Sequence, residues 1–298
     1  MLYNNLSGYL REKYGRRMKK ICIDGGFSCP NRDGTVGHGG CIYCGERGAG
    51  EHIDPLCGIG AQVRAALSYA DADEKFIAYF QNFTNTYGPV SNLRQKYDAA
   101  LIDERIKILA IGTRPDCIDH EVAELIASYR DRVDVWVELG LQTVSDTTAA
   151  SINRGYKTEA FFRAFELLSE YGIPTVVHII IGLPGEGESE ALETARAVAR
   201  LHPFGVKLHS MYVMDGTVLA DMYRRGEYTP IDRAAFVRTS AKCIAHMPPE
   251  TVIHRITGDC PRDLLVAPEW NTDKNGVIAD ICAYLSENGL KQGSLFDR

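Results

Sequence analysis

Apolar runs recur along the first two-thirds of the chain and alternate with amphipathic segments. The runs are apolar or β-branched at nearly every position, which is typical of strands buried on both faces of a parallel sheet. Helical spacing appears between them, for example in the apolar positions from Val122 to Tyr129. The pattern predicts six strands: Lys20–Asp24, Phe76–Gln81, Lys107–Gly112, Val133–Gly140, Thr175–Gly182 and Gly205–Val213.

Six strand–helix repeats predict an α/β fold with a parallel sheet. A closed eight-fold barrel takes about 250 residues, and only about 200 carry the alternation here, so we expect a partial (β/α)6 barrel of the TIM type. The expected organisation is a basic helical arm at 1–18, the barrel at 19–228 and an α/β extension at 229–298 packed on it. The extension is expected to hold a helix at Asp232–His246, a strand at Val252–Ile256 and a helix at Asp273–Asn288.

The charge of the chain does not indicate a nucleic-acid-binding protein, since the net charge is -6 and the pI is near 5.8. One segment differs: Arg11–Lys20 holds six basic residues and one acidic residue. Two interpretations of it stay open, a solvated amphipathic helix and an arm that contacts phosphates.

The chain shows no membrane or export pattern. No apolar run approaches the roughly 18 to 20 residues that span a bilayer, and the N-terminal segment lacks the order of a signal peptide. We therefore expect a cytoplasmic protein with no membrane partner. Thiols stay reduced there, so the nine cysteines are expected to be metal ligands or buried thiols rather than disulfides.

Three of these cysteines, Cys29, Cys41 and Cys44, lie in the segment CPNRDGTVGHGGCIYC after the first predicted strand. Loops at the carboxyl ends of strands carry the chemistry of βα folds. Glycines such as Gly34 and Gly40 permit the tight turns that let thiolates converge. Three thiolates can hold a four-iron cluster with one iron left open.

A zinc site is the alternative interpretation of this segment. Structural zinc sites use four protein ligands, and His38 would complete a set with the three cysteines. Such zinc sites usually stabilise a small domain, whereas this loop follows the first strand of a predicted barrel. A zinc-stapled binding protein without catalysis therefore remains as the less favoured hypothesis.

Five further segments accompany the cysteine loop in a fixed order: QNFTNTYGP (81–89), IGTRPDCI (111–118), ELGLQT (138–143), INRGY (152–156) and HIIIGLPGE (178–186). Together with the loop they resemble the YhcC/YtqA family of radical SAM proteins, which is related to the Elongator catalytic subunit and to coproporphyrinogen dehydrogenase-like enzymes. That family also stretches the first cysteine interval to eleven residues, as here. The phrases VIHRITGD (252–259) and LLVAPEW (264–270) extend the resemblance over nearly the whole chain.

The resemblance implies a radical SAM enzyme whose [4Fe–4S] cluster is held by Cys29, Cys41 and Cys44. S-adenosylmethionine (SAM) would chelate the open iron, and one electron would cleave it to a 5′-deoxyadenosyl radical. The electron donor would be a protein such as flavodoxin or ferredoxin.

The resemblance also implies residues around SAM and the substrate. Tyr43 would pack near the adenine, although it is alternatively a buried ring. The residues expected to contact SAM or line its cavity are Gln81, Asn82, Thr84, Glu138, Gln142, Arg154, Gly182 and Leu183. Glu138 and Arg154 are the catalytic candidates, because a charge within an apolar strand is expensive unless paired. A purely structural Glu138–Arg154 ion pair is the alternative, and Lys207 and His209 are further substrate candidates.

Kinship with the Elongator subunit implies tRNA as the substrate. The radical would act on the C5 side chain of the wobble uridine and convert carboxymethylaminomethyl to aminomethyl. The basic segment could hold phosphates, and Tyr14 could stack on a base. The alternative is radical chemistry on a small molecule or a tetrapyrrole-like acid.

Overall fold

The main sheet holds seven parallel strands. The computed structural model describes residues 2–48 and 58–297. The strands run in the order β1-β2-β3-β4-β5-β6-β8, so β1 and β8 form its two edges. Their bounds are β1 Met18–Ile23, β2 Lys75–Phe80, β3 Ile106–Thr113, β4 Asp134–Gln142, β5 Thr175–Ile181, β6 Gly205–Ser210 and β8 Val252–Arg255. The six predicted strands and the partial barrel are confirmed, and the strand expected in the C-terminal extension joins the same sheet as its seventh member.

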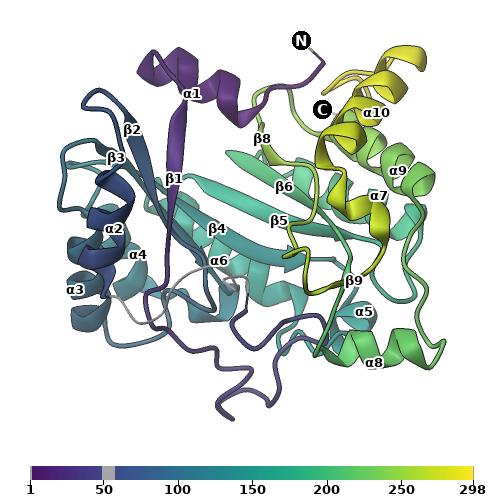
Figure 1. The fold of residues 1–298 in the computed structure, drawn as a ribbon, viewed down its shortest axis with the longest axis horizontal. Helices are drawn as coiled ribbons and strands as arrows, with labels where there is room; N and C mark the ends of the chain where they lie inside the picture. The colour runs from purple at the N-terminus through teal and green to yellow at the C-terminus, as the bar shows by residue number, and fades with distance from the viewer. Residues whose placement is uncertain (1, 49–57, 298) are drawn as a thin grey trace.

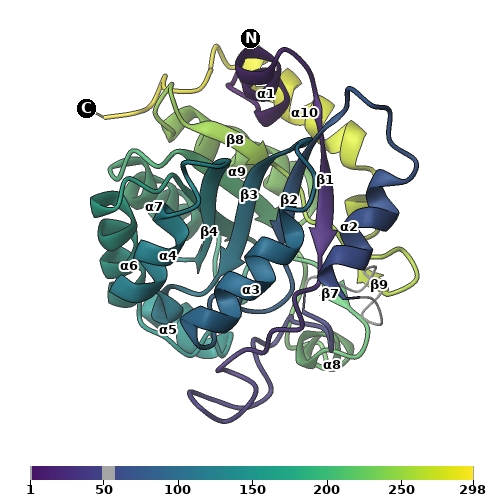
Figure 2. The same ribbon diagram turned by 90° about the vertical axis from the view of Figure 1, so that its left-hand side faces the viewer.

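Helices cover the outer face of the curved sheet (Figures 1 and 2). Outward-facing strand residues such as Leu109, Val137 and Ile179 join the helices in the largest hydrophobic core. The outward-facing strand positions are therefore apolar, whereas the inward-facing positions also hold polar residues such as Tyr79, Glu138 and Lys207. The helices are α2 Ile59–Leu67, α3 Val90–Ala100, α4 His120–Ala127, α5 Asp146–Ser151, α6 Thr158–Glu170, α7 Glu188–Ala199, α8 Val218–Arg224, α9 Arg233–His246 and α10 Lys274–Glu287, with 3-10 turns η1 Pro115–Cys117 and η2 Glu269–Thr272.

The N-terminal helix α1 (Leu6–Tyr14) lies at the amino ends of the strands. Asn5 caps its start, and Gly15 ends it in the left-handed conformation with φ 77°. Its buried Leu10 packs with Ile77 and Trp136, which point into the barrel. The helix therefore closes the bottom of the half-barrel with an apolar layer.

The basic segment Arg11–Lys20 is divided between α1 and β1 rather than forming one helical arm. Gly15 stops the helix, and Lys20 already belongs to the sheet. Three of its cations pair with acidic residues of the chain: Lys13 with Asp134, Arg16 with Asp73 and Lys19 with Glu74. Tyr14 donates a hydrogen bond to Asp134. These contacts occupy groups that were expected to hold phosphates and a base.

The C-terminal extension shares the main sheet. The strand expected at Val252–Ile256 is β8, which pairs in parallel with β6 and thereby covers an otherwise open edge. Both helices expected in the extension are present as α9 and α10. The sixth predicted strand is interrupted after Ser210, and β7 (Val213–Met214) pairs with β9 (Leu265–Ala267) in a separate small sheet. Within the described residues no helix has the length and apolarity needed to cross a bilayer.

Candidate active site

A cavity of about 320 Å³ occupies the half-barrel and opens at the carboxyl ends of its strands. Cys29, Cys41 and Cys44 line its upper part. Side chains that point inward from β1 to β8 line its lower part. Inward positions of β4 illustrate the depth: Glu138, Gly140 and Gln142 all face the cavity, and they span about 13 Å along the strand.

Hydrogen bonds shape the cysteine loop. The guanidinium of Arg32 donates to the carbonyls of Cys44 (3.2 Å), Gly45 (2.5 Å) and Glu46 (3.1 Å). Gly40 has φ 79°, and a Cβ there would lie 2.8 Å from Nε of Arg32. The second half of the loop is therefore folded around one arginine, and glycine is required at this turn.

The loop is also tied to the segment that follows β4. The amide of Asn31 donates to the carbonyl of Asn153 (2.6 Å), and the amide of Asn153 donates to the carbonyl of Gly40 (2.7 Å). Asn153 has a positive φ of 52°. This reciprocal pair fixes the cysteines over the barrel mouth.

The surroundings of the three thiols fit an iron–sulfur cluster. Contact with the Cys44 thiol lowers the pKa of Cys41 to about 7, and the positive charges of Arg114 and Arg154 act in the same direction. The same contact raises the pKa of Cys44 well above its ordinary value, so the pair shares one proton. Thiolates are the ligands that such clusters use. His38 is exposed and does not line the cavity. In the part of the chain that the structure describes, no three His, Cys, Asp or Glu residues are grouped to hold a single metal ion, which holds for the three cysteines alone and for their set with His38.

Six of the residues predicted to contact SAM or line its cavity do line it: Tyr43, Gln81, Thr84, Glu138, Gln142 and Arg154. The hydroxyl of Thr84 is buried without a hydrogen-bond partner. Buried polar groups are normally hydrogen-bonded, so this hydroxyl suits a contact with a polar ligand. Gln142 has φ 69°, an uncommon conformation for a residue other than glycine. The bulge that ends β4 turns its side chain into the cavity.

Asn82, Gly182 and Leu183 do not line this cavity. Successive strand residues face opposite sides, so Gln81 points inward and Asn82 points outward, where its amide donates to Asp24 at 2.8 Å. The carbonyl of Gly182 accepts a hydrogen bond from Tyr228 (2.7 Å), and Leu183 is buried in the apolar cluster against which Tyr43 packs. In this structure these residues support the site rather than face its interior.

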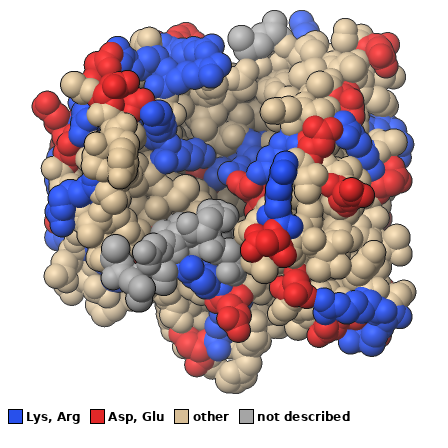
Figure 3. All heavy atoms as spheres, in the orientation of Figure 1, with Lys and Arg blue, Asp and Glu red and all other residues tan. Residues whose placement is uncertain are grey.

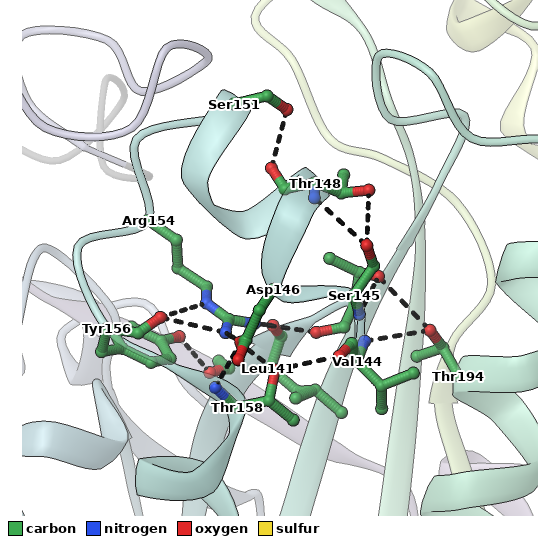
Figure 4. Close-up of polar contacts among 12 residues, drawn as sticks. Leu141, Val144, Ser145, Asp146, Thr148, Ser151, Arg154, Tyr156, Thr158 and Thr194 are labelled. Atoms are coloured by element: carbon green, nitrogen blue, oxygen red, sulfur yellow. Dashed lines mark hydrogen bonds and ion pairs between the residues drawn. The ribbon is translucent and has the colours of Figure 1, made fainter.

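Arg154 is fully buried, and protein oxygens occupy its guanidinium (Figure 4). It donates to the carbonyls of Leu141 (2.6 Å), Thr143 (2.8 Å) and Tyr156 (3.0 and 3.1 Å) and to the hydroxyl of Thr158 (3.0 Å). These bonds join the end of β4 to the start of α6. Arg154 therefore positions the rim of the cavity.

The ring of Tyr156 lies between two guanidiniums. Those of Arg154 and Arg114 lie 4.5 Å and 4.7 Å from its centroid. Arg114 also donates to the carbonyl of Arg154 (2.9 Å) and forms a two-point ion pair with Asp116. Two positive charges therefore stand beside the cysteines, which suits an anionic cluster with thiolate ligands.

Glu138 does not pair with Arg154. One of its oxygens, Oε2, accepts hydrogen bonds from the Tyr79 hydroxyl (2.8 Å), from Lys207 and from Nε2 of His178 (2.9 Å). The Trp136 indole donates to Oε1 (3.2 Å). Burial alone would raise the pKa of Glu138, but the charge of Lys207 and the His178 contact hold it well below its ordinary value. The alternative of a Glu138–Arg154 pair was wrong, because Arg154 sits in the rim and Glu138 at the floor.

Several cavity residues were not assigned from the sequence although the family motifs contain them. They are Arg114 in IGTRPDCI, Tyr156 in INRGY, His178 in HIIIGLPGE and Arg255 in VIHRITGD. For His178 on β5 and Arg255 on β8, the signal that could have found them is the one that selected Glu138, a polar or charged residue on a strand. Arg114 and Tyr156 lie in loops beyond the strands, where this signal does not apply.

A βα half-barrel with a three-cysteine loop over its mouth defines a class of enzyme. The model of the Radical SAM superfamily matches residues 34–198, and that of the Radical_SAM C-terminal domain matches residues 203–287. The chain belongs to the radical SAM superfamily and is a radical SAM enzyme, and this class uses a [4Fe–4S] cluster and SAM.

Two individual relatives are similar to the chain over nearly the full length of both proteins. The chain is 39% identical to the YtqA protein of Bacillus subtilis over 99% of this chain and 93% of that protein. It is 36% identical to the YhcC protein of Escherichia coli over 100% and 96%. The expected family is therefore confirmed.

More distant relatives match only in part. A tRNA uridine(34) acetyltransferase of Dehalococcoides mccartyi is 32% identical over 57% of this chain and 37% of that protein. The solved structure of Elp3 from the archaeon Methanocaldococcus infernus superposes with a TM-score of 0.65 at 20% identity, over 78% of this chain and 59% of that one. This likeness supports the half-barrel fold.

Proposed function

We propose that this radical SAM enzyme modifies the C5 side chain of the wobble uridine in tRNA and converts carboxymethylaminomethyl to aminomethyl. When bound, the cluster and SAM would supply a 5′-deoxyadenosyl radical that abstracts a hydrogen atom from the CH2 of the carboxymethyl group. Transfer of one further electron to the redox partner protein would leave an imine, and water would hydrolyse it to the aminomethyl group with release of glyoxylate. Cys29, Cys41 and Cys44 would hold the cluster. The observation that carries the tRNA assignment is the similarity to a relative named for its action on tRNA uridine 34.

The small volume of the cavity supports a substrate of which only the reacting side chain enters. Its volume of about 320 Å³ is at the lower end of the range for small-molecule sites. Enzymes that modify a base take it out of the stack and hold it in a pocket. A wobble uridine already lies in an unpaired loop, so its side chain can enter the barrel while the rest of the tRNA stays outside.

Other residues would protect and orient the reacting groups. The helix α1 and the apolar layer of Ile77, Ile108 and Trp136 seal the cavity from below. Exclusion of water from this end would protect a reactive radical. Thr84 and Gln142 at the mouth offer polar atoms to SAM, and Arg154 fixes the backbone beside them.

Nucleoside analysis of bulk tRNA tests this function. A strain that lacks the gene is expected to accumulate carboxymethylaminomethyl uridine and to lose aminomethyl-type derivatives. The wild-type gene should restore the profile, whereas the Cys41→Ala gene should not. An unchanged wobble-uridine profile in the deletion strain would overturn the tRNA assignment and favour the small-molecule alternative.

A further inference from the structure

The floor of the cavity is charged, although barrel interiors are commonly filled by apolar layers. Below the floor lie Ile77, Ile108 and Trp136, which pack against α1. Above it, Gly112 and Gly140 have no side chains and leave the interior open. The polar groups between these layers therefore face the cavity.

We propose that Lys207, Arg255 and His209 form a binding site for a carboxylate group of the substrate. All three line the cavity, from the adjacent strands β6 and β8. This inference rests on the proposed function and deepens it, because a carboxymethylaminomethyl side chain ends in such a carboxylate.

Positive charge exceeds negative charge around this floor. Lys207 and Lys20 face one carboxylate, Glu138. Arg255 lies 3.6 Å from the carboxylate of Asp259, which also binds Lys274. Among the described residues there are thus two cations for each carboxylate. Figure 3 shows Lys and Arg atoms on the walls of a hollow in this face of the molecule.

The excess positive charge at the floor is energetically unfavourable, and a bound anion would neutralise it. A buried cation is unfavourable unless it is fully paired. Burial, together with the positive charges of Lys20 and Arg255, lowers the pKa of Lys207 to about 7, although the charge of Glu138 acts in the opposite direction. An anion bound at the floor would favour the charged form of Lys207.

His209 supplies an independent indication of a missing ligand. Its Nε2 atom is buried and has no hydrogen-bond partner, and its ring lies 5.2 Å from that of His178. Burial, with the nearby charges, holds its pKa well below the ordinary value, so its imidazole is neutral. A neutral imidazole can donate one hydrogen bond, and a carboxylate oxygen would accept it.

The position of Glu138 selects a monoanion. Its carboxylate binds Lys207 from below, so a dianionic phosphate on the other side of the same ammonium would be repelled. The carboxylate of SAM is expected at the other end of the cavity, beside the cysteines. Glu138 lies about 13 Å along β4 from Gln142 at that end.

A fluorinated probe tests the site on the full-length, cluster-loaded protein. Trifluoroacetate carries the carboxylate, and trifluoroacetamide is a matched uncharged control of similar size. The ¹⁹F line width of trifluoroacetate is expected to increase with wild-type protein, whereas that of trifluoroacetamide is not. Equal broadening of the two probes, or none of either, would overturn the proposal.

Variants locate the binding. Arg255→Met should weaken trifluoroacetate binding about tenfold, the loss expected for one charge-assisted hydrogen bond. Its side chain is one-third exposed, so the variant should fold, and a thermal melt checks this. His209→Phe should also weaken binding, while Lys242→Met, which changes a lysine that pairs with Glu188 outside the cavity, should not. Wild-type affinity in both floor variants would contradict the site.

The pH dependence gives a second readout. The groups that face Lys207 are Glu138, His178, Tyr79, Lys20, Arg255, Cys22, His209 and His254. Burial keeps the pKa of His178, His209 and His254 below the ordinary value, so all three stay neutral above pH 7. Affinity for trifluoroacetate should fall as pH rises above 7, because Lys207 loses its proton. A pH-independent affinity would contradict the assignment.

This experiment contains no tRNA. Its failure is therefore distinguishable from a failure of the tRNA assignment, which nucleoside analysis tests. If the tRNA profile is unchanged but the probe binds at Arg255, the enzyme acts on another carboxylate-bearing molecule.

Discussion

Nε2 of His178 on β5 lies 2.9 Å from Oε2 of Glu138 on β4, at the floor of the half-barrel. The same oxygen accepts from Tyr79 and binds Lys207, so four strands meet at one atom. Each of these four strands contributes an inward polar group that finds its partners only because the sheet is curved. The network therefore couples the curvature of the barrel to the charge state of its interior.

Replacing Glu138 with glutamine should destabilise the protein strongly. The change keeps the shape but removes the counter-ion of Lys207, which must then remain an unpaired buried cation or give up its proton. Removal of one partner of a buried pair costs about 3 to 5 kcal/mol. Urea denaturation followed by circular dichroism would measure this loss in the free energy of unfolding.

The double variant Glu138→Gln/Lys207→Met separates the charge from other effects. It should recover much of the loss, because no unpaired ammonium remains. An exposed pair gives the matched control: Glu159→Gln, which removes the contact with Arg163 on α6, should change stability by less than about 1 kcal/mol. Equal losses in the single and double variants would show that Lys207 is not the reason.

Arg154→Met should also destabilise the fold by about 3 kcal/mol or more. The side chain holds three backbone carbonyls and one hydroxyl in a fully buried position, and their loss leaves buried acceptors unsatisfied. The same urea titration measures it, with the exposed Arg163→Met as the control. A stability within about 0.5 kcal/mol of wild type would mean that the bonds of Arg154 are not structural.

The sequence was sufficient for the strands because they leave a local pattern, continuous apolar runs that indicate burial. Three cysteines in a glycine-rich loop predict the cluster ligands, and that assignment stays a prediction. The pairing of β8 with β6 left no such pattern, because the sheet edge that it covers is created only by folding. The same holds for Asp73, Asp134 and Glu74, which neutralise the basic segment from distant parts of the chain.

The assignment of single side chains was less complete. The alternation of a strand already implies that Gln81 and Asn82 face opposite sides, so the inclusion of both in one cavity was avoidable. The partner of Glu138 was not predictable, because Arg154 is near in sequence whereas Lys207 is 69 residues away. Only the register β4-β5-β6 brings Lys207 to it.

Cys41→Ala should abolish cluster binding. The thiolate of Cys41 is one of three proposed ligands, and its loss leaves two. After anaerobic reconstitution the variant should contain little iron and sulfide, lack the brown colour and release no 5′-deoxyadenosine from SAM. Cys282→Ala, which changes a thiol on α10 outside the cavity, should keep all three properties. Retained SAM cleavage by Cys41→Ala would contradict the ligand assignment.

Gly140→Ala should impair SAM turnover while leaving the fold intact. A Cβ at this position would lie 2.7 Å from Nε2 of Gln142 and 3.6 Å from the Tyr156 hydroxyl. The flexible amide of Gln142 can move aside, so the strand survives, but the polar group at the cavity mouth is displaced. We expect at least about a tenfold loss of 5′-deoxyadenosine formation, since small misplacements of positioning groups cost that much or more. Gly8→Ala on α1, whose added Cβ makes only an ordinary contact, should retain wild-type turnover. Unchanged turnover in Gly140→Ala would show that Gln142 takes no part in holding SAM.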